Sequence, residues 1–217
     1  MTEIVDKRGV LRRIAGAKLD LGCGPRKRGP DYIGVDARDH EAVDVVGDVF
    51  DVLASIPDAS IAYVFSSHFM EHVDRIPPLI QELGRVLAPG GKLETIVPHF
   101  SNPYYYSDVT HRTAFGIYSM AYFAVGSHFR RQVPMYAQPA LFQLNSVKLV
   151  FKAPRPFYGR YAINKVVERI VNSSRAAKEF YEGVASYWIP CYELRFLMTR
   201  IADSEDRADS ASENLSL

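Results

Sequence analysis

Three aspartates in the first quarter of the chain each stand at or beside the end of a short apolar run. Asp20 lies in KLDLGCGP, Asp36 in YIGVDA and Asp48 in VVGDVFD. A carboxylate that ends a strand can accept both hydroxyls of a ribose or an adenine amino group. Gly22 and Gly24, after the first run, allow a tight turn and close approach of the backbone to a ligand. The pattern predicts a nucleoside-binding site, although each aspartate alone could equally be a loop carboxylate or a helix cap.

Candidates for acid–base chemistry follow in PHFSNPYYYSDVTHRTAF, residues 98–115. His111 could take a proton from a hydroxyl as a general base, with Asp108 orienting its ring and keeping it neutral. His99 is the alternative base. Asp108 could instead cap a following helix, and the two roles are compatible.

The segment HFMEH, residues 68–72, matches the H-x-x-E-H pattern of one group of zinc peptidases. Such a site needs both histidines on one face of an established helix and a third ligand downstream. Here the pattern begins directly after an apolar run, where no helix is established. We therefore expect no metal site. His72 is expected to pack or cap beneath the loop that binds the nucleoside ligand, and His68, closer to the end of the apolar run, is expected to face the ligand-binding cleft.

The elements that must position these residues are short runs rich in Val, Ile, Leu and Tyr. Residues 18–21, 32–35, 43–46, 61–66 and 92–97 are predicted to be strands, and most are apolar on both faces, as in a covered parallel sheet. Between the last two, apolar residues recur at helical spacing from Ile76 to Leu87, Pro77 and Pro78 suit a first turn, and Pro89-Gly90-Gly91 ends the helix. Strands at 145–152 and 192–201, with a helical segment at 162–181 between them, complete a doubly wound, mostly parallel, seven-stranded α/β sheet. Ligands are expected at the carboxyl ends of its strands.

The glycine turn separates two kinds of nucleoside ligand. A dinucleotide would use a G-x-G-x-x-G turn that opens a helix, but Lys27 stands at the third glycine, and Pro25 and the short connection leave no room for a full helix. S-adenosylmethionine (SAM) carries no phosphate and needs only close backbone approach with polar groups for its amino acid and ribose. The residues therefore favour SAM.

The segments DLGCGP, GVDA, GDVFD, SSHFMEHV and LGRVLAPGGKL resemble, in order and spacing, the successive motifs of class I SAM-dependent methyltransferases. The short first crossover is similar to that of a subgroup often seen among methyltransferases predicted for bacterial surface-glycan pathways. The resemblance implies that the glycine turn binds the methionine part, Asp36 the ribose and Asp48 the adenine side, with residues 66–71 beside the methyl group. The implied cofactor-binding residues are Asp20, Gly22, Cys23, Gly24, Asp36, Ala37, Asp48, Val49, Ser66, Ser67 and Glu71, and S-adenosylhomocysteine is the expected product.

Methyl transfer is an in-line displacement at a sulfonium, so alignment in a dry site can supply most of the catalysis. The catalytic candidates are His111, Asp108, His99 and His68, and the substrate-binding candidates are Arg112, Tyr104, Tyr106 and Tyr118. The aromatic residues could instead form the core of an inserted subdomain, and the arginine could be solvated. SSHF stands where many amino-group methylases of bases carry an N/D-P-P-Y/F tetrapeptide. This difference favours a hydroxyl oxygen of a small-molecule or glycan acceptor.

The chain of 217 residues is the size of one domain, which we place at residues 1–202, with a substrate or lid insertion at 99–140 and a disordered acidic tail at 203–217. A net charge of +1 gives no reason to expect a nucleic-acid partner. No apolar run of membrane-spanning length and no secretory signal is evident, and the two cysteines suggest no disulfide framework. A cytoplasmic location is expected.

Two other functions stay open at this stage. The protein could be a catalytically silent SAM-binding scaffold. It could also dock on an anionic membrane through its basic N-terminal region and the helical region 158–187, and so reach a lipid-linked glycan. The sequence leaves peripheral membrane contact and the oligomeric state undecided.

Overall fold

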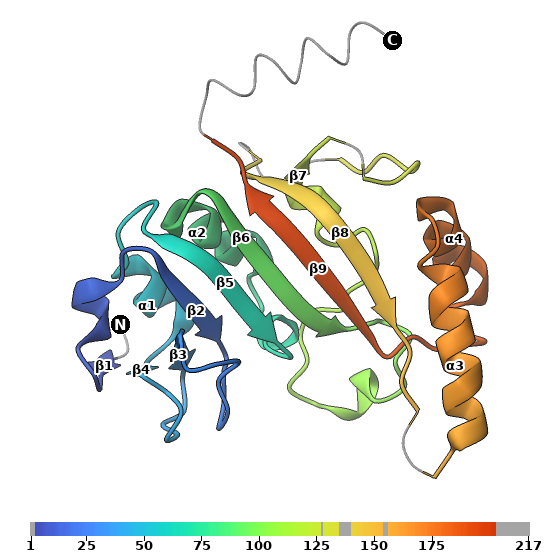
Figure 1. The fold of residues 1–217 in the computed structure, drawn as a ribbon, viewed down its shortest axis with the longest axis horizontal. Helices are drawn as coiled ribbons and strands as arrows, with labels where there is room; N and C mark the ends of the chain where they lie inside the picture. Colours follow the sequence, from blue (N-terminus) through green and yellow to red (C-terminus); the bar gives the residue numbers. More distant parts are fainter. Residues whose placement is uncertain (1–2, 127, 135–139, 154–155, 203–217) are drawn as a thin grey trace, which may run out of the picture.

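The computed structural model describes residues 3–126, 128–134, 140–153 and 156–202. Within these ranges, nine strands form one sheet in the order β1-β4-β3-β2-β5-β6-β9-β8-β7 (Figure 1). The longer strands are β2 (Ala17–Leu21), β3 (Tyr32–Asp36), β5 (Ile61–Ser67), β6 (Leu87–Pro98), β8 (Phe142–Val150) and β9 (Glu193–Arg200). Three strands have two residues each, β1 (Val5–Asp6), β4 (Val45–Val46) and β7 (Ala124–Val125).

The sheet confirms the predicted doubly wound α/β fold, with nine strands in place of seven. The additional strands, β1 and β7, lie at the two edges and are too short for an alternating pattern to reveal them. Strands β4, β3, β2, β5 and β6 run parallel, whereas β9 is antiparallel to both of its neighbours. The strand order reverses between β2 and β5. At such a switch point a doubly wound sheet opens a crevice at the carboxyl ends of its strands.

Two α-helices belong to the first half of the sheet, α1 (Val49–Ala54) and α2 (Ile76–Val86), and no helix joins β2 to β3, as the short loop predicts. In α2, Pro77 and Pro78 occupy the first turn, where missing N–H groups cost nothing, and the apolar face is buried. The helix ends at Val86, because Leu87 is already extended and begins β6. The predicted end at Pro89 is therefore three residues too late.

The helical segment predicted at 162–181 is divided into α3 (Tyr158–Val171), α4 (Arg175–Phe180) and the wider turn η5 (Tyr181–Ala185). Asn172 causes the break. Its amide oxygen accepts from Leu149 N at 3.0 Å and its amide nitrogen donates to Leu149 O at 2.7 Å, so its side chain is fastened to β8. Ser174 then caps α4 by accepting from Ala177 N. Figure 1 shows α3 and α4 side by side next to β8.

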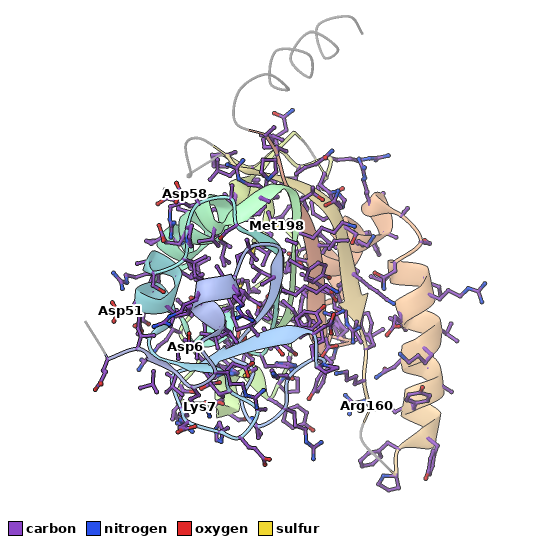
Figure 2. The ribbon with its side chains drawn as sticks, turned by 60° about the vertical axis from the view of Figure 1, so that its left-hand side comes forward. Asp6, Lys7, Asp51, Asp58, Arg160 and Met198 are labelled. Atoms are coloured by element: carbon purple, nitrogen blue, oxygen red, sulfur yellow. The ribbon has the colours of Figure 1, made fainter. Side chains whose placement is uncertain are left out.

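Four short 3₁₀ turns complete the described structure: η1 (Val10–Arg13), η2 (Met70–His72), η3 (Tyr105–Ser107) and η4 (Ala121–Phe123). The core is formed by the apolar faces of the central strands together with α2, and it includes Leu19, Val64, Leu83 and Met198. Met198 lies within the sheet in Figure 2. The predicted acidic tail, residues 203–217, lies outside the described residues, and no described helix combines the length and apolar character that a membrane crossing requires.

Candidate functional site

A cavity of about 310 Å³ lies at the switch point of the sheet. Its size is within the range of small-molecule sites. The loops that follow β2, β3, β4 and β5 supply the walls, which are lined by Gly22, Val35, Asp36, Ala37, Gly47, Asp48, Val49, Phe50, Phe69, His72, Val73, Asp74 and Arg75. Five of the predicted cofactor residues are among them: Gly22, Asp36, Ala37, Asp48 and Val49.

Gly22 is required at its position for two separate reasons. Its φ of +65° is in the left-handed region that favours glycine, and a Cβ atom there would lie 2.4 Å from Cδ2 of Phe69. The backbone at Gly22 and the ring of Phe69 thus form two touching walls of the cavity. A ligand in the cavity can approach the backbone of Gly22 closely because no side chain intervenes.

Asp36, at the end of β3, is hydrogen-bonded to the glycine turn. Its Oδ2 accepts from Gly24 N at 2.9 Å and its Oδ1 accepts from Arg38 N at 2.8 Å. An ionised carboxylate has about four lone-pair sites, so acceptor capacity for two hydroxyls is left. This geometry fits the predicted contact to a ribose.

Asp48 and Asp20 have different local roles. Asp48 caps α1 by accepting from Phe50 N at 2.9 Å, so the cap predicted as the alternative is present, and the residue also lines the cavity. Asp20 is buried and accepts from Arg28 N at 2.7 Å. Burial raises the pKa of Asp20, against a smaller opposing effect of that hydrogen bond. Asp20 therefore holds the loop after the glycine turn and does not line the cavity.

The structure does not bring the other predicted cofactor residues to the cavity wall: Cys23, Gly24, Ser66, Ser67 and Glu71. Burial raises the pKa of the Cys23 thiol to about 12, so it stays protonated at neutral pH. Ser66 is buried and shares a 2.8 Å hydrogen bond with Thr95. Their contribution to cofactor binding stays a prediction.

His68 lies between two buried carboxylates at the end of β5. Its Nδ1 is 3.2 Å from Glu71 Oε1 and its Nε2 is 3.5 Å from Glu193 Oε2. Hydrogen bonds with Glu193 and then with Glu71 raise the pKa of His68 to about 9. The ring is charged at neutral pH, so it lacks the lone pair that the predicted catalytic role as a base would need.

Three basic side chains, His68, Lys152 and Arg195, surround the carboxylate of Glu193. Burial by itself would raise its pKa, but hydrogen bonds from His68, Lys152 and Arg195 outweigh burial and lower the pKa to about 2. Lys152 Nζ is 2.6 Å from Oε2 and Arg195 is 2.9 Å from Oε1. Sequence reasoning missed this cluster, because its members come from loops and strands far apart in the chain.

His72 faces the cavity, which corrects the prediction that it packs or caps beneath the cofactor loop. Its ring centroid is 4.9 Å from that of His111. Thr110 Oγ1 donates to Asp108 Oδ1 at 2.6 Å, so it accepts from His72 Nδ1, 2.9 Å away. The lone pair of neutral His72 is therefore on Nε2.

His111 has the same arrangement of protons. Its Nδ1 is 2.8 Å from the carbonyl oxygen of Tyr105, and a carbonyl can only accept, so Nδ1 carries the proton and Nε2 the lone pair. The ring also stacks on Tyr105. Asp108 Oδ2 is 3.7 Å from Nε2, beyond a hydrogen bond, and Asp108 accepts instead from Thr110. The Tyr105 carbonyl orients His111, the task that the sequence assigned to Asp108, and Asp108 fixes a turn in place of a helix.

His99 is fully buried at the end of β6. Its Nδ1 accepts from Ser101 N at 3.1 Å, and its Nε2 is 3.1 Å from Glu182 Oε2. Both ring nitrogens have protein partners, and His99 does not line the cavity. The alternative base is thus held in a position that an acceptor could reach only after rearrangement.

The substrate-binding candidates are spread over the segment between β6 and β8. Tyr104 and Tyr106 are exposed, and Tyr104 borders a small cavity of about 20 Å³ that Lys152 and Arg160 also line. Tyr118 donates to Glu179 Oε1 at 3.0 Å and packs on Phe129, in keeping with the structural alternative. Exposed Arg112 is 3.8 Å from Asp74, a residue of the main cavity.

Among the cavity residues that the sequence did not single out are Phe50, Phe69 and Arg75. The guanidinium of Arg75 lies over the ring of Phe50, 4.4 Å from its centroid. Phe69 lies within the HFMEHV motif and Arg75 lies two residues after it, so the motif itself was a signal that the loop after β5 faces the ligand. Nothing in the sequence connects Arg75 with Phe50.

A family described as "Methyltransferase domain" matches residues 19–95, which include the glycine turn, Asp36, Asp48 and the loop after β5. No curated protein matches the chain in sequence.

Solved structures share the fold at low sequence identity. A SAM-dependent methyltransferase from Archaeoglobus fulgidus is 18% identical with a TM-score of 0.55, covering 89% of this chain and 92% of that one. A methyltransferase from Haloferax volcanii, solved with the Trm112 activator and described as putative, is 16% identical with a TM-score of 0.51, covering 91% and 89%. Phosphoethanolamine N-methyltransferase 2 of Haemonchus contortus, solved with SAM, is 15% identical with a TM-score of 0.51, and the match covers 89% of this chain but 51% of that one.

The methyltransferase-domain match over residues 19–95 and the shared fold both agree with the predicted class I SAM-dependent methyltransferase. The predicted class, fold and cofactor are confirmed, and SAM is the methyl donor. The glycan subgroup stays a prediction.

Proposed function

We propose that the protein methylates a hydroxyl oxygen of a small-molecule or glycan acceptor and that His72 and His111 activate this hydroxyl. The observation that carries the proposal is the imidazole pair beside the cofactor cavity, with no hydrogen-bond donor from the described residues on Nε2 of either ring. A hydroxyl needs such activation far more than an amine does, because it must lose its proton as the new bond forms. An imidazole can assist directly at Nε2 or as the ligand of a cation.

SAM supplies the methyl group as a sulfonium. The acceptor oxygen forms a bond to the methyl carbon while the sulfur–carbon bond breaks, its electron pair stays on sulfur, and the hydroxyl proton leaves. In this chain, Gly22 and Phe69 exclude water along one wall and Asp36 anchors the nucleoside, so the residues hold the donor while the histidine pair acts on the acceptor.

The test is transfer of a labelled methyl group from SAM to a panel of sugars, glycans and phenols, with amines as comparison. His111→Ala should lower turnover by roughly 10² to 10⁴ while SAM affinity is nearly unchanged, because the lost group acts in the transfer step. His40→Ala is the matched control, since His40 does not line the cavity. Full turnover in His111→Ala, or labelling of amines alone, would refute the proposal.

A membrane-docked form of this function has support from α3 and from the segment that begins at Phe180, the last residue of α4. Large apolar side chains are exposed on both: Tyr158, Tyr161, Ile163, Val166 and Ile170 on α3, and Phe180, Val184, Tyr187, Trp188 and Ile189 after it. Exposed cations accompany them on α3, namely Arg160, Lys165 and Arg169, and Figure 2 shows Arg160 on this helix. An apolar surface bordered by cations fits an anionic bilayer, near which each Lys or Arg contributes about 1 kcal/mol. Such docking would bring a lipid-linked acceptor to the enzyme.

The chain contains a probe for this docking, because Trp188 is its single tryptophan and is 87% exposed. Anionic phosphatidylglycerol vesicles should sediment the protein and shift the Trp188 emission to shorter wavelength, whereas neutral phosphatidylcholine vesicles should not. Replacing Arg160, Lys165 and Arg169 by glutamate should abolish both effects and leave SAM affinity unchanged. Membrane docking would be refuted if the monomeric protein does not sediment with anionic vesicles. It would also be refuted if the protein associates with itself through this surface and does not bind vesicles.

A further inference from the structure

We infer that Glu71, His72 and His111 form a binding site for a divalent metal ion beside the cofactor cavity. One ligand atom from each of these three residues lies within 4.8 Å of the others. A carboxylate and two imidazoles are ligands that first-row divalent ions such as Mn²⁺, Co²⁺ and Zn²⁺ accept. Three protein ligands leave further coordination positions for an acceptor or water.

The burial of Glu71 is an independent indication that a cation binds at this cluster. The residue is fully buried, and Oε2 of its carboxylate has no hydrogen-bond partner among the described residues. The other oxygen, Oε1, is held 3.2 Å from His68 Nδ1. A buried carboxylate oxygen without a partner is costly unless something else binds it, and a cation at the cluster would do so.

Both histidines have the hydrogen bond on the second ring nitrogen that usually orients a metal-binding imidazole. Nδ1 of His72 donates to Thr110 and Nδ1 of His111 donates to the Tyr105 carbonyl, which fixes both rings and leaves both Nε2 lone pairs available. Thr110 in turn donates to Asp108. Thr110, Asp108 and the Tyr105 carbonyl thus hold the two histidine ligands in place through hydrogen bonds.

The charges around the cluster also favour a cation. The carboxyl groups of Glu71 and Asp108 both lie at the cluster, with Asp108 Oδ2 3.7 Å from His111 Nε2. His68 contacts a second carboxylate besides Glu71, because its Nε2 is 3.5 Å from Glu193 Oε2. The expectation of no metal considered His68 and His72 as the ligand pair, whereas the structure pairs His72 with His111, 39 positions later.

The ion would have a defined task, and this part of the inference rests on the proposed function. An acceptor hydroxyl in an open coordination position has a lowered pKa, so it can pass its proton to a water molecule while its oxygen attacks the methyl carbon. Nε2 of each histidine then binds the ion and does not take the proton. The cation both orients the acceptor and activates it.

The test is calorimetric titration of the chelator-treated full chain with Mn²⁺ and with Co²⁺, where Co²⁺ also gives visible absorption bands that report its ligands. One ion should bind per chain. His72→Ala and His111→Ala should each lower affinity at least about 100-fold, and Thr110→Val about 10-fold, because the threonine only fixes a ligand. Glu71→Gln preserves the size of the buried side chain and should also abolish tight binding. His40→Ala is the control with unchanged affinity, and SAM binding shows that each variant is folded.

Two results would overturn the site: a wild-type chain that binds no Mn²⁺, Co²⁺ or Zn²⁺, or binding that persists in both histidine variants. Ion binding is measured without an acceptor, so it is independent of the proposed function. If the ion binds and no hydroxyl is methylated, the metal site stands and the proposed function fails. If hydroxyls are methylated equally well in the chelated protein without ion binding, the proposed function stands and the metal site fails.

Discussion

Replacement of Gly22 by alanine should damage both stability and cofactor binding, and the structure allows the two causes to be separated. The first cause is backbone strain, since an alanine at φ +65° costs about 1 to 2 kcal/mol. The second is a clash, since the new Cβ would lie 2.4 Å from the ring of Phe69, and overpacking of this kind costs about 1 to 3 kcal/mol. The sum is a loss of about 2 to 5 kcal/mol in the free energy of unfolding.

Gly24 offers a matched control two residues away. Its φ is +56°, also left-handed, but a Cβ there would meet nothing within 4 Å. Gly24→Ala should therefore show the strain alone, about 1 to 2 kcal/mol. Phe69→Gly removes Cβ, Cγ and Cδ2 of Phe69, the three atoms that the new Cβ would meet, so in this background Gly22→Ala should cost about as much as Gly24→Ala.

The assay is urea denaturation of the two single variants, Phe69→Gly and the double variant, with SAM affinity measured by calorimetry. Gly22 and Phe69 both line the cavity, so Gly22→Ala should weaken SAM binding about tenfold or more, the equivalent of about 1.4 kcal/mol. Equal stability losses for Gly22→Ala and Gly24→Ala in the wild-type background would refute the packing between Gly22 and Phe69.

Three further predictions concern single side chains. Asp36→Ala should weaken SAM binding by roughly 1.5 to 3 kcal/mol by calorimetry, with exposed Asp39→Ala as control; unchanged affinity would remove the ribose contact. Glu193, with its pKa lowered to about 2 from 4.5, should stabilise the fold by about 3 kcal/mol above pH 4.5 and lose this as the pH falls toward 2. Glu193→Gln should therefore flatten the stability profile in that acid range, and an unaltered profile would contradict the assignment. Asn172→Ala should lower the free energy of unfolding by about 1 to 3 kcal/mol, because Leu149 loses two partners; a thermal melt measures this, and an unchanged melting temperature would contradict it.

The sequence predicted elements well where the pattern was local and periodic. The strands at β2, β3 and β5 and the helix α2 each place apolar residues at a regular spacing, so the fold class followed from the order of these elements. Prediction was poorer where a long-range contact set the boundary. The break between α3 and α4 depends on Asn172 reaching Leu149, and no local propensity shows that β8 will lie beside it.

The residues of the candidate site also fall into two groups, those that local sequence predicted and those that only long-range contacts bring together. The sequence by itself determined the glycine turn with Asp36 and Asp48, because each residue stands at the end of its own strand and parallel strands end at one edge of a sheet. Only the tertiary structure decided which histidine meets which partner: His72 meets His111, His68 is charged between Glu71 and Glu193, and His99 is buried against Glu182. The physical reason is that these residues lie on separate loops, turns and strands up to 125 positions apart (His68 to Glu193). The packing of the whole sheet brings them together, and no local periodicity predicts it.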